Sequence, residues 1–200
     1  MEHFYQKTIG EDWFTYPNLY SSIPTYFGEG AKFVEVGVWK GRSVSYLAVE
    51  VINANKAQKI YAVDTWAGSE EHIDPSNVNF NSELLNNPDW LYNLYLQNIE
   101  PVKDIITSIR KPSLEAVNDF EDESLDFVFI DAAHDYENVK ADILAWLPKL
   151  KKTGILAGHD YWPGDPVQIA VDEIFSSFKI ETPDHRTWLY NVDKWGNDLN

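Results

Sequence analysis

Residues 33–43 read Phe-Val-Glu-Val-Gly-Val-Trp-Lys-Gly-Arg-Ser, and this stretch decides the fold class of the chain. An apolar strand runs directly into a turn flanked by Gly37 and Gly41, and a helix with apolar residues at helical spacing is predicted over 43–52. Glycine can adopt positive φ and lets another group approach the main chain closely. A strand, a glycine turn and a helix in this order predict an α/β protein with a ligand site at the turn.

The spacing of the two glycines narrows the choice of ligand. Gly37 and Gly41 form Gly-x-x-x-Gly, with the acidic Glu35 shortly before the first glycine. A dinucleotide pyrophosphate is instead held by Gly-x-Gly-x-x-Gly, which this turn lacks. The turn therefore favours a ligand with no phosphate to bind, although close packing of a helix would by itself also explain the two glycines.

Two further predicted strands end in a carboxylate. Asp64 ends the strand over 59–64, and Asp131 ends the strand over 125–131. An acid at the end of the second strand of a doubly wound fold can accept hydrogen bonds from ribose hydroxyls, so Asp64 is predicted to hold a ribose. Because parallel strands bring their carboxyl ends to one edge of the sheet, we expect both carboxylates to lie there beside Gly37.

The rest of the chain alternates strands with helices, which predicts a doubly wound, mainly parallel sheet with helices on both faces. Further strands are predicted over 104–109, 154–158 and 186–192, and helices over 82–98 (interrupted near Asn87-Pro88), 112–120, 136–150 and 167–178. The segment 65–81 is polar, has few apolar anchors and is predicted to be irregular.

The composition excludes several classes of function. A formal net charge of −16 argues against a nucleic-acid partner, because such proteins need a basic stripe to displace counterions. The absence of cysteine excludes disulfides, thiolate metal sites and cysteine nucleophiles. The N-terminus lacks the pattern of a signal peptide, and no stretch approaches the roughly eighteen apolar residues of a membrane span, so a cytoplasmic protein with no membrane partner is expected.

Four motifs in a fixed order carry a resemblance to a known family. They are Glu35-x-Gly-x-x-x-Gly-x-Ser43, Val-Asp64-Thr-Trp, Phe-Ile-Asp131-x-x-His134-x-Tyr and Gly-His159-Asp160-Tyr. Together they resemble the class I S-adenosylmethionine-dependent methyltransferases, and within them the small-molecule O-methyltransferase branch that includes sugar and macrolide methyltransferases. The resemblance runs from about residue 33 to residue 161. It implies a Rossmann-like fold with a seven-stranded sheet.

The resemblance also implies which residues border the methyl donor, S-adenosylmethionine. These are Glu35, Gly37, Gly41, Ser43, Asp64, Thr65, Ser113 with Leu114, and Asp131. Glu35 could accept a hydrogen bond from the donor's ammonium, and the N-terminus of the helix after the turn suits its carboxylate. Ser43 could instead serve only as the cap of that helix.

A hydroxyl acceptor is a poor nucleophile until it loses its proton, so the site should hold a base or a metal ion. The resemblance places the base at His134 and metal ligands at Asp131 and Asp160, with His159 as a third. Mg²⁺ or Mn²⁺ would suit such oxygen ligands. His159 stands where relatives carry an oxygen donor, so it could instead be a second catalytic base beside Asp131 and His134 in a site without metal. His134 could also be only a solvent-facing residue at a helix start.

One domain over 1–200 is expected from the length. Residues 1–32 would form an N-terminal cover, 33–161 the donor-binding core, and 65–98 a lid or a wall of the acceptor site. The leading prediction is an S-adenosylmethionine-dependent O-methyltransferase of a sugar or other small natural product, with a small-molecule acceptor as partner and a homodimer left open. The alternatives are an NAD-dependent oxidoreductase or epimerase on a similar sheet, and a donor-binding module without catalysis.

Overall fold

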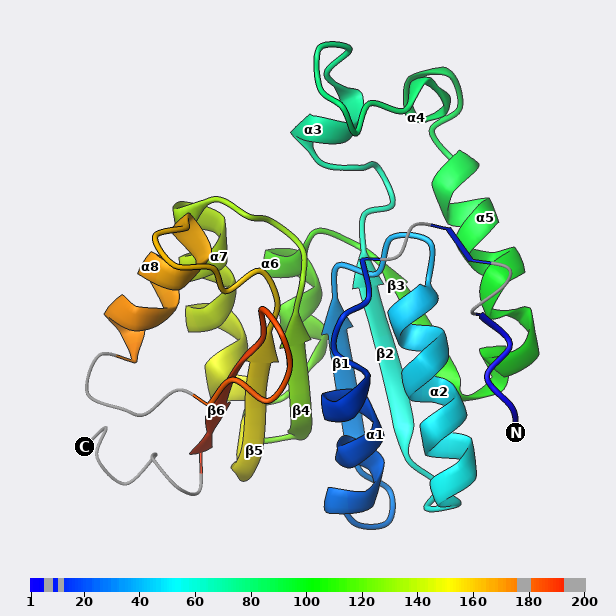
Figure 1. Ribbon diagram of the computed structural model, residues 1–200. Coiled ribbons are helices and arrows are strands. Elements are labelled where there is room, and N and C mark those ends of the chain that lie inside the picture. Colours follow the sequence, from blue (N-terminus) through cyan, green and yellow to red (C-terminus); the bar gives the residue numbers. More distant parts are fainter. Residues whose placement is uncertain (6–8, 11–12, 176–180, 193–200) are drawn as a thin grey trace.

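The computed structural model describes residues 1–5, 9–10, 13–175 and 181–192 (Figure 1). Six strands in these ranges form one sheet in the order β3-β2-β1-β4-β5-β6. Their bounds are β1 Lys32–Val36, β2 Lys59–Asp64, β3 Ile106–Arg110, β4 Leu125–Ile130, β5 Leu150–Gly158 and β6 Trp188–Asn191. The first five strands are parallel, and β6 is antiparallel to β5. The predicted doubly wound, mainly parallel sheet is therefore confirmed.

The predicted strand count of seven is wrong, because the described chain forms six. Beyond β6, the residues that the structure describes add an isolated antiparallel bridge between Glu181 and Leu189. Pro183 follows two positions later and has no backbone N–H to donate to a ladder. The described chain then turns at Asp184–Thr187 into β6.

Helices cover both faces of the sheet, as predicted. The first hydrophobic cluster joins one face to α1 (Pro17–Tyr26), α2 (Arg42–Ala54) and α5 (Trp90–Ile99). The second cluster joins the other face to α6 (Ser113–Ala116), α7 (Tyr136–Trp146) and α8 (Pro166–Ile174). The β4 residues are all buried, because this central strand has a helical layer on each side.

The N-terminal helix α1 is fixed to the sheet at its C-terminal end. Its carbonyl groups near Pro24 cannot all bond within the helix, and two side chains that precede β2 donate to them. Gln58 Nε2 donates to the carbonyls of Pro24, Phe27 and Gly28, and Lys56 Nζ donates to those of Pro24, Thr25 and Phe27. This capping positions the residues that precede α1 over the carboxyl edge of the sheet.

The segment after β2 rises beyond the carboxyl edge and carries two short helices, α3 (Glu70–Ile73) and α4 (Ser82–Asn86) (Figure 1). The predicted interruption near Asn87-Pro88 is confirmed, since α4 ends before it and α5 begins after it. The prediction that 65–81 is irregular missed α3, which a capping box between Ser69 and His72 starts. Short 3-10 turns complete the fold over Glu100–Ile105, Val117–Asp119 and Leu147–Lys149. None of the helices in the described ranges is long and apolar enough to span a bilayer.

Candidate functional site

A cavity of about 480 Å³ opens at the carboxyl edge of the sheet. Its walls include the segment before α1 (13–16), the turn after β1, the segment 65–79 and the residues that follow β4 and β5. Lys111 and Ser113 after β3, and Arg186 before β6, also line it. Its volume falls within the usual range of roughly 300–1,000 Å³ for small-molecule sites. Segments predicted as the N-terminal cover and as a lid thus meet at one cavity.

The two turn glycines have different surroundings. Gly37 borders the cavity with φ 86°, and a Cβ there would lie 2.0 Å from the carbonyl oxygen of Asp131. No other residue fits, because the turn packs directly on the backbone that follows β4. Gly41 has φ 85° and faces away from the cavity, where a Cβ would lie 2.9 Å from the ring of Tyr95 in α5. Gly41 thus provides the close helix packing that the spacing left open.

Asp64 lies at the cavity wall and holds the glycine turn in place. Its Oδ2 accepts from the backbone N–H groups of Val38 (2.7 Å) and Trp39 (2.9 Å), and its Oδ1 accepts from that of Trp66 (2.7 Å). Burial raises the pKa of Asp64, and these backbone bonds oppose the rise. The backbone of Thr65 contributes to the same effect, so four backbone groups surround the carboxylate where it borders the cavity.

Glu35 lies beneath the cavity and is fully buried. Its carboxyl group accepts hydrogen bonds from the hydroxyls of Tyr20 (3.0 Å) and Ser43. Burial raises the pKa of Glu35 to about 8, against the effect of these two bonds. Of the pair, Ser43 is the residue that borders the cavity, so Glu35 is placed to act on a ligand through the Ser43 hydroxyl.

Thr65 and Ser113 also border the cavity, on the side of β2. The Thr65 hydroxyl accepts from the backbone N–H of Ala67 (3.2 Å), and the Ser113 hydroxyl accepts from the indole N–H of Trp146 (2.9 Å). Leu114, the neighbour of Ser113, is exposed. These residues and Asp64 form the end of the cavity nearest β2.

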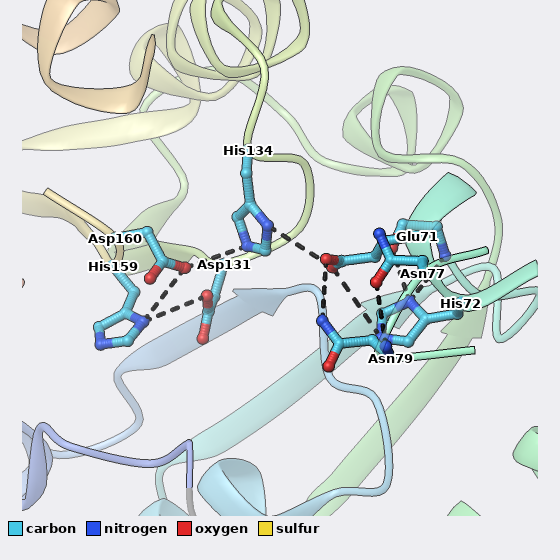
Figure 2. A network of polar contacts seen from close by, with 9 residues as sticks. Glu71, His72, Asn77, Asn79, Asp131, His134, His159 and Asp160 are labelled. Atoms are coloured by element: carbon cyan, nitrogen blue, oxygen red, sulfur yellow. Dashed lines mark hydrogen bonds and ion pairs between the residues drawn. The ribbon is translucent and has the colours of Figure 1, made fainter. Parts of the chain in front are cut away.

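Four ionisable residues gather at the other end, and we call them the reactive cluster: Asp131, His134, His159 and Asp160. They follow β4 and β5, which are neighbours in the sheet. Figure 2 shows the His134 ring between the other three residues and Glu71 of α3. His134 Nε2 lies 3.0 Å from Asp160 Oδ2, and its Nδ1 lies 3.8 Å from Glu71 Oε1. The hydrogen bond to Asp160 raises the pKa of His134 to about 9, despite partial burial.

Both ring nitrogens of His159 are engaged within the protein. Nε2 lies 2.8 Å from the Thr15 hydroxyl. Nδ1 lies 3.4 Å from Asp160 and 3.7 Å from Asp131, as Figure 2 shows. Burial lowers the pKa of His159, but the two carboxylates outweigh it and raise that pKa to about 9. Burial raises the pKa of Asp160, and the two histidines together bring it well below its usual range.

Asp131, His134 and Asp160 are close enough to share a metal ion. They each offer a ligand atom, and these atoms lie within 4.8 Å of one another. This set contains His134 in place of His159, the histidine that the sequence pattern suggested as a ligand. Two carboxylates and an imidazole suit Mn²⁺, Fe²⁺ or Zn²⁺ better than Mg²⁺.

Sequence reasoning missed several residues that contact the reactive cluster. The Tyr16 hydroxyl donates to Asp131 Oδ2 at 2.8 Å, Thr15 contacts His159, and Glu71 faces His134. His72 stacks on Trp39, with ring centroids 4.2 Å apart, and closes the cavity between α3 and the glycine turn. They come from segments without a recognisable motif, and only the folding of the cover and of α3 over the sheet edge brings them to the site.

Comparisons with known proteins identify the family and the fold. Residues 34–161 match the family described as "Methyltransferase domain". A curated relative, the uncharacterized protein y4gI of Sinorhizobium fredii, is 30% identical over 129 residues, which are 64% of this chain. The chain spans only 13% of that protein's length.

Solved structures share the fold. The O-methyltransferase NovP is 15% identical, with a TM-score of 0.63 over 88% of this chain and 76% of that one. The O-methyltransferase from Bacillus cereus in complex with SAH is 16% identical, with a TM-score of 0.57 over 86% and 78%. Fibrillarin from Aeropyrum pernix with natively bound S-adenosyl-L-methionine is 13% identical, with a TM-score of 0.54 over 86% and 73%. At this identity they establish the fold alone.

Proposed function

The chain belongs to the methyltransferase-domain family, and from this premise we propose that it transfers a methyl group from S-adenosylmethionine to a hydroxyl of a small molecule, such as a sugar or another natural product. The match over 34–161 confirms the family resemblance that the motifs predicted. The observation that carries the choice of a hydroxyl acceptor is the His134–Asp160 pair at the cavity, since a hydroxyl needs a base.

The end of the cavity near β2 fits the donor. The Asp64 carboxylate borders the cavity, where it would accept from a ribose hydroxyl, and Gly37 has no side chain that would fill the space beside the turn. Ser43, backed by the buried Glu35, would meet the donor's amino group. The bound donor supplies an electrophilic methyl carbon on a positively charged sulfur, so transfer needs only an oriented acceptor oxygen that has lost its proton.

His134 is the residue placed to take that proton. Asp160 accepts a hydrogen bond from Nε2–H at 3.0 Å, and this leaves Nδ1 of the neutral ring with its lone pair toward the cavity. The acceptor hydroxyl gives its proton to Nδ1, its oxygen forms the new bond to the methyl carbon, and the carbon–sulfur bond breaks. The products are a methyl ether, S-adenosylhomocysteine and a His134 imidazolium that Asp160 stabilises.

His159 has a different role in this proposal. Because Thr15, Asp131 and Asp160 occupy its ring nitrogens, it has no lone pair to offer to an acceptor. Its imidazolium instead lies between the two carboxylates and compensates their charge. A site with this internal compensation needs no metal ion to hold Asp131 and Asp160 together.

A divalent ion is the second candidate for activating the acceptor, because Asp131, His134 and Asp160 can converge on one ion. Such an ion would act as a Lewis acid on the acceptor oxygen. It would have to replace the hydrogen bond between His134 and Asp160, and the charge compensation by His159 already holds the two carboxylates together without it.

We therefore expect turnover to survive removal of divalent ions. The measurement is the methylation rate in excess EDTA, compared with added Mg²⁺ or Mn²⁺, together with elemental analysis of the purified protein. Loss of turnover in EDTA with recovery in Mn²⁺, at unchanged S-adenosylhomocysteine affinity, would instead assign the acceptor activation to a metal.

Tyr16→Phe should lower kcat about tenfold, because Asp131 would lose the buried hydroxyl that orients it at 2.8 Å. Tyr20→Phe is the matched comparison, since Tyr20 of α1 likewise donates a buried hydroxyl to a carboxylate, that of Glu35. We expect Tyr20→Phe to change donor KM rather than kcat. Equal effects of both variants on kcat would mean that the cover acts only through stability.

The function itself is tested by a thermal-shift series followed by methyl transfer. S-adenosylmethionine and S-adenosylhomocysteine should raise the midpoint of unfolding, and NAD⁺ should not. Radiolabelled methyl groups should then appear in an acceptor from a panel of sugars, catechols and polyketides. Stabilisation by NAD⁺ alone would favour the oxidoreductase alternative.

A further inference from the structure

Arg186 carries a positive charge that the rest of the described chain does not pair. It precedes β6, borders the cavity on the side away from Asp64, and lies with Cζ 3.7 Å from the ring centroid of Trp162. Its Nε is buried without a hydrogen-bond partner among the described residues. Lys111, another cation on the cavity wall, is by contrast ion-paired to Asp119 at 2.6 Å. A partly buried guanidinium without a partner is unfavourable until an anion binds it.

The turn that carries Arg186 is fixed before any ligand arrives. Asp184 N–H donates to the Thr187 hydroxyl (3.0 Å), which donates back to the Asp184 carbonyl (2.8 Å). The Asp184 carboxylate accepts from Leu19 N–H in the first turn of α1 (2.6 Å), so it is not directed at the guanidinium. Arg186 itself has φ 64°, and its carbonyl accepts from Tyr161 N–H at 3.0 Å.

We propose that Arg186 binds an oxyanion of the acceptor, a carboxylate or a phosphate, while the acceptor's hydroxyl meets His134. The planar guanidinium can donate two parallel hydrogen bonds to such a group, and its stacking on Trp162 orients it. The overall charge of −16 repels anions, so an acidic acceptor needs a local cation of this kind.

The position of Arg186 sets the size of the acceptor. Its backbone pairs with Tyr161, directly after Asp160, and β6 lies one strand beyond β5. Arg186 precedes β6 and His134 follows β4, so two strand spacings of about 4.8 Å each separate the strands that carry them. The two side chains take up part of that span, and we infer that the rest accommodates a molecule the size of one sugar ring. The inferred substrate class is therefore small hydroxylated acids, such as sugar acids or sugar phosphates. This inference rests on the proposed methyl transfer.

The test is calorimetric titration of the protein saturated with S-adenosylhomocysteine. The probes are D-glucuronate, D-glucose 1-phosphate and D-glucose, which share a ring and differ in charge. Wild-type protein should bind one or both of the charged probes more tightly than D-glucose. Arg186→Met should weaken that binding about ten- to hundredfold. Arg186→Lys should weaken it less, because lysine keeps the positive charge but cannot donate two parallel hydrogen bonds. The two charged probes separate a carboxylate from a phosphate site.

Lys103→Met is the control, because it removes one positive charge from an exposed residue before β3, at the opposite edge of the sheet. It should leave the binding of every probe unchanged. Equal affinity of wild-type protein for D-glucose and for both charged probes would overturn the inference, as would unchanged binding by Arg186→Met. Failure to bind S-adenosylhomocysteine would instead contradict the proposed function. Circular dichroism and the unfolding midpoint of each variant verify that its fold is intact.

Discussion

His134→Ala is expected to lower the rate of methyl transfer about 10²- to 10⁴-fold while S-adenosylhomocysteine affinity stays nearly unchanged. The imidazole accepts the proton only as the new bond forms, so its loss acts on the transition state rather than on donor binding. Its side chain is 49% exposed, and no hydrogen bond to the sheet depends on it, so the fold should tolerate the change. Single-turnover rates with saturating donor measure the effect.

The pH dependence of the rate gives a second measure of His134. A base must be neutral, and a pKa of about 9 leaves roughly one per cent of a histidine neutral at pH 7. The rate should therefore rise with pH through about 9, later than the range of 6 to 7.5 that an ordinary histidine predicts. Binding of the cationic donor should move this rise to lower pH. Asp160→Asn should also move it down, because Asp160 is the largest cause of the raised pKa.

Two comparisons decide whether these effects belong to His134. His3→Ala changes a histidine that pairs with Glu50, outside the cavity, and should leave the rate unchanged. His159→Asn should reduce the rate through the placement of Asp131 and Asp160, and it should move the rise to higher pH, because the two carboxylates then act on His134 without a second cation beside them. A wild-type rate in His134→Ala would show that His134 is not the base.

The strand ends that carry the site could be predicted from the sequence because their positions follow from sheet geometry. Parallel strands place their carboxyl ends at one edge, so Asp64, Asp131 and Asp160 had to lie near Gly37 once the strands were identified. The partners of these residues could not be predicted in the same way. Thr15 and Tyr16 reach the site only because α1 packs across the sheet, and no local spacing encodes that packing.

Arg186, near the other end of the chain, is a second residue whose place at the site could not be predicted from local spacing. Its guanidinium lies at the cavity because β6 returns antiparallel beside β5, whereas the sequence alone left the order of the last strand undetermined. Residues of one motif can also have different roles that their spacing does not reveal. Gly37 and Gly41 belong to one motif, yet one borders the cavity and the other packs against α5.

Asp64→Ala is expected to weaken S-adenosylhomocysteine binding by roughly 2 to 4 kcal/mol, which corresponds to about 30- to 1,000-fold, through loss of the charge-assisted bond to a ribose. The same carboxylate accepts from the backbone N–H groups of Val38, Trp39 and Trp66. Removing it leaves these donors without their partner and lets the glycine turn move. We therefore expect the free energy of unfolding to fall by about 2 to 4 kcal/mol as well. A residue that contacted only the ligand would leave the free energy of unfolding unchanged.

The two effects are separated by a carboxylate with a similar structural role far from the cavity. Asp126 lies near the start of β4, at the amino ends of the parallel strands, and is largely buried. It accepts a hydrogen bond from Lys32 N–H (2.9 Å) and pairs with Lys151 (2.9 Å). Asp126→Ala should therefore lower the midpoint of unfolding while S-adenosylhomocysteine binds with wild-type affinity. If Asp64→Ala binds as tightly as Asp126→Ala at a matched loss of stability, Asp64 only supports the turn, and the ribose is held by another residue. Calorimetry well below both midpoints distinguishes these outcomes, because the folded fraction is then close to one in each variant.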